Sequence, residues 1–205
     1  MISAAEALAR LRDGNRRFAS RSHDDGNRLA TRPAEVADGQ EPFAIILGCS
    51  DSRVPAEIVF DQGLGDLFVI RVAGNIVAPS QIGSVEFAAT KFGTRLVVVL
   101  GHSKCGAVEE TLRQLHAPTE ERSRNLRSIV DFVRPSVEAL LAKGLGDDPE
   151  ALIGQAVRAN IQASAEHMRH GSEILEVLER DEGLLIVGAE YSLETGLVDF
   201  FDGVP

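Results

Sequence analysis

Two short stretches of the chain place reactive side chains where an apolar run ends. In ILGCSDSRVPAE, Cys49, Asp51 and Arg53 stand at alternate positions directly after the first run. In VVVLGHSKCGAVEE, His102 and Cys105 follow the second run, and the chain has no other cysteine. Two thiolates and one imidazole are a donor set that suits zinc. Three protein ligands leave the fourth tetrahedral position for water or substrate, which is the pattern of a catalytic zinc site.

The carboxylate in the first of these stretches leaves two arrangements open. Asp51 can fill the fourth position on the metal, or it can form a hydrogen bond with whatever binds there. A two-point contact with the guanidinium of Arg53 would hold the carboxylate away from the metal and keep it ionised. Three other interpretations of the cysteines stay open: inert core residues, a disulfide between Cys49 and Cys105, and a thiol redox protein, for which no Cys-x-x-Cys motif is present.

Both donor stretches need elements that bring their ends together. Short apolar runs typical of buried strands alternate with helical patterns, which predicts an α/β fold with a mainly parallel central sheet flanked by helices. Ligands of such sheets collect outside the carboxyl ends of the strands, so both stretches can open on one edge. The expected strands lie at residues 43–48, 66–74, 95–102 and 183–191. One expected helix, Ser80–Phe92, lies between the second and third strands, and another, Cys105–His116, follows the third.

The two ends of the chain extend this core. Ser3 and Glu6 form a capping-box pattern, and an apolar stripe of Ala7, Leu8, Leu11 and Phe18 predicts an amphipathic helix, followed by a polar linker. We therefore divide a single domain of residues 1–205 into an N-terminal helical arm with its linker, 1–40, and an α/β core, 41–205.

A long segment between the third and fourth expected strands is almost wholly helical in pattern. It runs over residues 123–181, and we expect breaks at Pro135 and at KGLGDDPE, residues 143–150. This predicts a helical excursion beside the sheet before the last core strand. After it, SLETGLVDFF, residues 192–201, is typical of a turn and a short closing strand.

Composition narrows the class of protein. The 205 residues carry a net charge of -10, which disfavours nucleic acids and anionic membranes as partners, because binding them requires clustered Lys and Arg. The first residues lack the apolar core of a signal peptide, and no run of apolar residues is long enough to span a bilayer. We expect a cytoplasmic protein, where so few cysteines serve catalysis or metal binding more often than disulfides.

Taken together, CSDSR followed by GHSKCG resembles the β-class carbonic anhydrases. The resemblance implies one Zn²⁺ per chain, held by Cys49, His102 and Cys105, and a catalytic dyad of Asp51 and Arg53. It implies reversible hydration of carbon dioxide to bicarbonate and a proton, through attack by zinc-bound hydroxide. Asp51 would be a fourth zinc ligand only in a closed state.

The same resemblance assigns further residues and an assembly. Gln40, Phe68, Phe87 and the backbone amide of Gly106 match positions that line the substrate cleft of the family. Members form dimers or larger assemblies through the N-terminal helix, so we expect a homodimer or homotetramer built with the Ser3–Phe18 segment.

One departure from the family pattern concerns regulation. Some members are inhibited by bicarbonate at a second site made of a tryptophan, an arginine and a tyrosine. Arg71 and Tyr191 match two of these, but the chain has no tryptophan and Ile46 stands in its place. The sequence therefore favours an enzyme whose zinc is open at neutral pH. Two alternatives use the same zinc site: a hydrolase of carbonyl sulfide or carbon disulfide, and a non-catalytic bicarbonate sensor.

Overall fold

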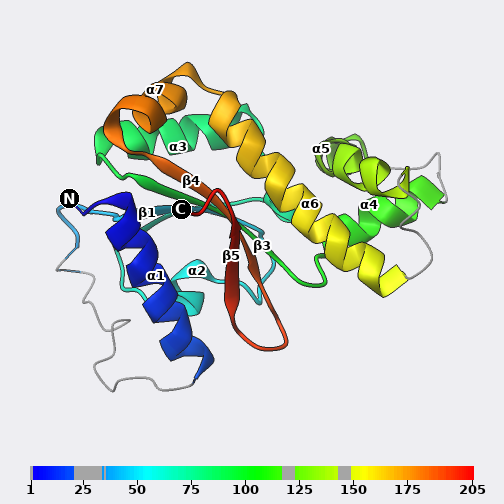
Figure 1. Ribbon diagram of the computed structural model, residues 1–205, viewed down its shortest axis with the longest axis horizontal. Helices are drawn as coiled ribbons and strands as arrows, with labels where there is room; N and C mark the ends of the chain where they lie inside the picture. Colours follow the sequence, from blue (N-terminus) through cyan, green and yellow to red (C-terminus); the bar gives the residue numbers. More distant parts are fainter. Residues whose placement is uncertain (1, 21–33, 35, 117–122, 143–148) are drawn as a thin grey trace.

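The computed structural model describes residues 2–20, 34, 36–116, 123–142 and 149–205 (Figure 1). Its centre is one five-stranded sheet with the strand order β2-β1-β3-β4-β5. The first four strands of the chain are parallel, and β5 runs antiparallel to β4, so the mainly parallel α/β fold predicted from the sequence is confirmed. The strands are β1 Ala44–Gly48, β2 Leu67–Arg71, β3 Leu96–His102, β4 Leu185–Tyr191 and β5 Val198–Asp202.

The two central strands explain the continuous apolar runs of the sequence. Every residue of β1 and of β3 is buried, because helices cover both faces of the sheet. In the parallel pairing of these strands, Gly48 lies opposite Leu100. Cys49 and His102 therefore leave the sheet at the same edge, as the alternating pattern of strands and helices predicts.

Helices cover the two faces unequally (Figure 1). One face packs against α1 and α2, and the other packs against the remaining helices, with α5 lying outward against α4 and α6. The segments α5, α6 and α7 form the predicted helical excursion before β4. The helices are α1 Ala4–Ala19, α2 Ala56–Val59, α3 Pro79–Lys91, α4 Gly106–His116, α5 Arg124–Leu141, α6 Pro149–His170 and α7 Glu173–Glu182, with a 3-10 turn at Ala73–Asn75. Among the described residues, no helix has the length and apolar character needed to cross a membrane.

The N-terminal helix α1 forms as the sequence predicts. Ser3 caps it, and the side chains of Ser3 and Glu6 make the reciprocal bonds of a capping box. Its apolar stripe, including Leu8 and Leu11, is buried against α2 and the sheet of its own chain. Most of the predicted linker lies outside the described residues. A role for α1 between subunits stays a prediction, and the buried stripe is already used within the chain.

One predicted break in the helical excursion is wrong. Helix α5 continues through Pro135, although proline removes a hydrogen bond to the carbonyl four residues earlier. Val133 and Val137 on either side are fully buried, so tertiary packing stabilises the helix across the lost bond. The second predicted break falls between α5 and α6, and residues 143–148 lie outside the described residues. The short α2 has no counterpart in the sequence prediction, because four residues show no helical period.

Glycine at one position allows α1 to approach α2. A Cβ added at Gly14 would lie 1.9 Å from the backbone oxygen of Phe60, whereas one added at Gly83, on the exposed side of α3, would meet nothing within 4 Å. We expect Gly14→Ala to lower the free energy of unfolding by about 1–3 kcal/mol through overpacking. Gly83→Ala is the matched control and should raise it by roughly 0.5–1 kcal/mol through helix propensity. Urea unfolding measures both, and a Gly14→Ala variant as stable as the parent chain would contradict this packing of α1.

Candidate metal centre

Three donor side chains meet at the carboxyl ends of β1 and β3. Cys49 follows β1, His102 is the last residue of β3, and Cys105 directly precedes α4. All three are buried, and one ligand atom from each lies within 4.8 Å of the others. Over the part of the chain that the structure describes, this is the one group of three or more His, Cys, Asp or Glu side chains able to hold a metal ion. The structure thus brings together the donors from both sequence motifs.

The imidazole is oriented as in a metal-binding histidine. Nδ1 of His102 lies 2.9 Å from the backbone oxygen of Ser103, to which it donates. Nε2 is buried and has no hydrogen-bond partner among the described residues. A buried acceptor without a partner is costly, but a lone pair aimed at a cation is satisfied. Both cysteines are free thiols, so the donor set fits zinc as the sequence predicts.

The two thiols contact each other, and this contact changes the pKa of both. Contact with Cys105 lowers the pKa of Cys49, and the backbone N–H of Gly74 assists by donating to the Cys49 sulfur at 3.4 Å. The same contact with Cys49, with burial, raises the pKa of Cys105. Zinc binding would require both sulfurs as thiolates, so a proton carried by either of them would be released when the metal binds.

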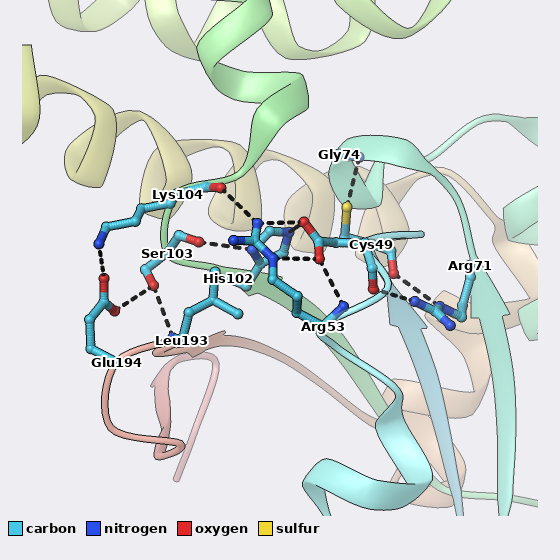
Figure 2. Close-up of polar contacts among 10 residues, drawn as sticks. Cys49, Arg53, Arg71, Gly74, His102, Ser103, Lys104, Leu193 and Glu194 are labelled. Carbon is cyan, nitrogen blue, oxygen red and sulfur yellow. Dashed lines mark hydrogen bonds and ion pairs between the residues drawn. The ribbon is translucent and has the colours of Figure 1, made fainter.

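Asp51 and Arg53 form the two-point contact that the sequence suggested. Nε of Arg53 lies 2.9 Å from Oδ1 of Asp51 and Nη2 lies 2.7 Å from Oδ2, while the backbone N–H of Arg53 also donates to Oδ1 (Figure 2). These hydrogen bonds hold the pKa of Asp51 well below its usual range. Oδ2 is 3.8 Å from Nε2 of His102, so the ionised carboxylate lies beside the metal donors while its oxygens are bonded to Arg53.

Arg71, the last residue of β2, supports the loop that follows β1. Its guanidinium donates to the backbone oxygen of Cys49 at 3.1 Å and to that of Asp51 at 2.6 Å. The resemblance placed Arg71 in a regulatory set with Tyr191, and here its donors hold the loop of the metal centre. Tyr191 and Ile46 are both buried, Ile46 within β1.

A strained turn supplies the N–H that bonds to Cys49. Gly74 and Asn75 both adopt positive φ, 71° and 44°. The buried side chain of Asn160, on α6, donates to the backbone oxygen of Gly74 at 2.8 Å. Sequence reasoning missed Asn160, which is 86 residues from its partner. Its one local signal is an amide between the apolar residues of a buried helix face.

The residues predicted to line the substrate cleft fall into two groups. Gly106 opens α4 and directly follows Cys105. Phe68 pairs with Ile45, four residues before Cys49, which is roughly 13 Å along the strand. Its ring packs 6.2 Å from that of Phe87.

Gln40 belongs to the distant group. It lines a cavity of about 530 Å³ together with Phe43 and Phe92, and the ring of Phe92 packs 6.1 Å from that of Phe68. Within one chain, the structure does not bring Gln40, Phe68 or Phe87 to the metal donors.

Comparison with known proteins gives the family. The α/β fold presents a Cys-His-Cys group that could hold a metal ion at two parallel strand ends, and the carbonic anhydrase family model matches residues 44–198. The chain is 38% identical to a carbonic anhydrase of Mycolicibacterium smegmatis, over 92% of this chain and 89% of that protein. It is 36% identical to carbonic anhydrase 2 of Mycobacterium tuberculosis, over 91% and 87%. The chain belongs to the carbonic anhydrase family and is an enzyme of that class.

Solved structures place the fold within the β-class. The β-carbonic anhydrase CcaA superposes with a TM-score of 0.74 at 26% identity, covering 96% of this chain and 95% of that one. The β-carbonic anhydrase CafA of Aspergillus fumigatus, at 24% identity, shares the fold with a TM-score of 0.75 over 98% of this chain and 91% of that one. The resemblance predicted from the two motifs is confirmed.

Replacing one thiol tests the metal centre directly. We expect the purified chain to contain about one zinc per chain, and Cys49→Ser to weaken zinc affinity by more than about 100-fold, because loss of outer-shell partners alone costs about 10–100-fold. Metal content by mass spectrometry and competition with a zinc indicator measure this. His170→Ala, on the exposed end of α6, is the control and should keep full zinc. Full zinc retention in Cys49→Ser would exclude this cysteine as a ligand.

Proposed function

We propose that this chain catalyses the reversible hydration of carbon dioxide to bicarbonate and a proton, with one Zn²⁺ held by Cys49, His102 and Cys105. One observation carries the proposal: the three buried donors lie beside the carboxylate of Asp51, whose oxygens are bonded to Arg53. With three protein donors, a zinc ion held there would keep a coordination position for water, as in other catalytic zinc sites. The family and the named relatives support the same activity.

Bound zinc would supply a Lewis acid that lowers the pKa of a bound water to about 7, which yields a nucleophile near neutral pH. The protein supplies the charge around it. Cys49 and Cys105 bring two negative thiolates, so we expect a smaller drop in that pKa than three neutral imidazoles would give. Activity should accordingly increase toward mildly alkaline pH.

Asp51 orients the nucleophile in this proposal. An ionised carboxylate only accepts hydrogen bonds, so a hydroxyl group beside Asp51 donates a hydrogen bond to it and turns a lone pair toward the carbon of the substrate. Arg53 is the positioning partner, since its guanidinium and backbone N–H hold both carboxylate oxygens. The dyad therefore supplies orientation, with the proton staying on the hydroxyl oxygen.

Gly106 can stabilise the charge that develops on the substrate. Its backbone amide lies at the first position of α4, where helix N–H groups lack partners within the helix. Such a donor, next to Cys105, can bond to an oxygen of carbon dioxide as it becomes negative.

We assign Gln40, Phe68 and Phe87 to a cleft shared between two chains. They lie away from the metal donors of their own chain, so they can line a substrate cleft only beside the donors of a second copy. This agrees with the predicted homodimer or homotetramer, and two β-carbonic anhydrases of Sordaria macrospora with this fold are tetrameric. We retain the cytoplasm as the proposed location.

Stopped-flow hydration of carbon dioxide from about pH 6.5 to 9, on zinc-quantified protein, tests the proposal. We expect rapid hydration that rises with pH, and a loss of about 100-fold or more in Asp51→Asn, because an amide no longer only accepts hydrogen bonds. The lowered pKa of Asp51 keeps its carboxylate ionised throughout this range, so the rise with pH belongs to another group. Asp181→Asn, in an exposed ion pair with Arg180, should leave the rate unchanged.

A zinc-replete chain without hydration activity would overturn the proposal. Turnover of carbonyl sulfide or carbon disulfide by that chain would then identify a hydrolase of these sulfur compounds. Binding of bicarbonate without turnover would identify a sensor.

A further inference from the structure

The turn between β4 and β5 contacts the segment that joins two of the metal donors. We propose that Glu194, in this turn, is a positioning residue: it holds Ser103 and Lys104 in place, and so determines how firmly the site retains its metal. The inference rests on the proposed zinc site. It adds a residue that lies far from both cysteine motifs in the sequence, about 90 positions after Cys105 and still further from Cys49. Figure 2 shows this carboxylate between the side chains of Ser103 and Lys104.

Ser103 connects the turn to His102. Its backbone N–H donates to the oxygen of Tyr191 at 3.0 Å, and its Oγ accepts from the N–H of Leu193 at 3.0 Å. The same Oγ donates to Oε2 of Glu194 at 2.8 Å. The carbonyl of Ser103 accepts from Nδ1 of His102, so the position of Ser103 sets the orientation of the imidazole.

Lys104 connects the turn to the catalytic dyad. Its φ is +53°, a conformation that residues with a side chain rarely adopt, so the segment needs contacts that hold it there. Nζ of Lys104 lies 2.6 Å from Oε1 of Glu194. The backbone oxygen of Lys104 faces Nη2 of Arg53 at 3.5 Å. A shift of Lys104 would therefore move both Cys105, its neighbour in sequence, and a contact of Arg53.

The turn closes through other groups. The backbone N–H of Gly196 donates to the backbone oxygen of Ser192, and the backbone N–H of Ser192 donates to that of Leu197. The N–H of Thr195 donates to Oγ of Ser192. Both oxygens of Glu194 instead contact the metal-binding segment, and Oε2 also accepts from Oγ of Ser192 at 3.2 Å. The backbone hydrogen bonds that close the turn do not involve Glu194, and within the turn its side chain contacts Oγ of Ser192.

The carboxylate of Glu194 stays ionised, which strengthens its contacts with Lys104 and Ser103. The side chains of Lys104 and Glu194 are 58% and 47% exposed, so their ion pair alone contributes little. The hydrogen bonds from Lys104 and from Ser103 together lower the pKa of Glu194 to about 2. The carboxylate is thus ionised at every pH at which the enzyme is assayed. Its contribution is complete above the ordinary pKa of 4.5 and is lost only as the pH falls toward about 2.

Zinc release tests the proposal without relying on activity. The zinc-loaded enzyme is mixed with a chromophoric chelator in excess, and the rate of zinc transfer is followed for the parent chain, Glu194→Gln and Glu194→Ala. We expect release to be about 10-fold faster or more in Glu194→Ala, in line with the loss of an outer-shell partner. Glu194→Gln keeps an acceptor for Ser103 and loses the ion pair, so it should lie between the two.

Thr195→Ala is the matched control. It removes an acceptor for the N–H of Leu197 within the same turn, and it leaves Ser103 and Lys104 untouched. We expect it to lower the melting temperature while zinc release stays at the parent rate. Equal release in Glu194→Ala and the parent chain, or release in Thr195→Ala as fast as in Glu194→Ala, would overturn the proposal.

The outcomes separate this inference from the proposed function. A parent chain that holds zinc but does not hydrate carbon dioxide, with release still accelerated in Glu194→Ala, would overturn the function alone. Hydration by the parent chain, with release unchanged in Glu194→Ala, would overturn the role of Glu194 alone. A parent chain that binds no zinc would overturn both.

Discussion

The parallel pairing of β1 with β3 is the constraint on which the metal centre depends. Because both strands run in the same direction and Gly48 lies opposite Leu100, Cys49 and His102 emerge side by side at one edge of the sheet. An antiparallel pairing would place the same residues at opposite edges. The pairing is itself secured by burial of every side chain in both strands, so the positions of the donors follow from the formation of the core.

Around this edge, groups from distant parts of the chain form hydrogen bonds with the backbone of three irregular loops. Such loops expose N–H and C=O groups that need partners once they are buried. Arg71 donates hydrogen bonds to the backbone oxygens of the loop after β1, and Asn160 donates one to the backbone oxygen of Gly74. Ser103 is held by the turn beyond β4. These contacts come from β2, α6 and the last turn, so donors that lie in two short motifs are oriented by much of the chain. In the proposed zinc site, such preorganisation would hold the donors in place before a metal binds.

The separation of Phe68 from the three donors follows from the same geometry. Phe68 lies toward the start of β2, whereas the donors lie at the strand ends, so one chain separates the aromatic cluster from the metal centre. A resemblance matches positions in a family and carries no statement about which chain supplies each of them. The register of β2 with β1 places Phe68 away from the donors, and the contact between the two rings places Phe87 beside Phe68. Helix α1 is a second example. Its apolar stripe predicts that one face is buried, but the sequence does not specify whether its own chain or another covers that face.

Local chemistry was readable from the sequence. The donor types, their places after apolar runs, the Asp51–Arg53 pairing and the capping box at Ser3 involve residues two or three positions apart, or strand ends that any parallel sheet brings together. The tertiary structure decided the rest. Helix α5 continues through Pro135 because its neighbours are buried. Asn160 reaches Gly74, and Glu194 reaches Ser103, across 86 and 91 positions of the chain. Contacts at such separations depend on strand order and helix packing, and no local period of the sequence encodes either of them.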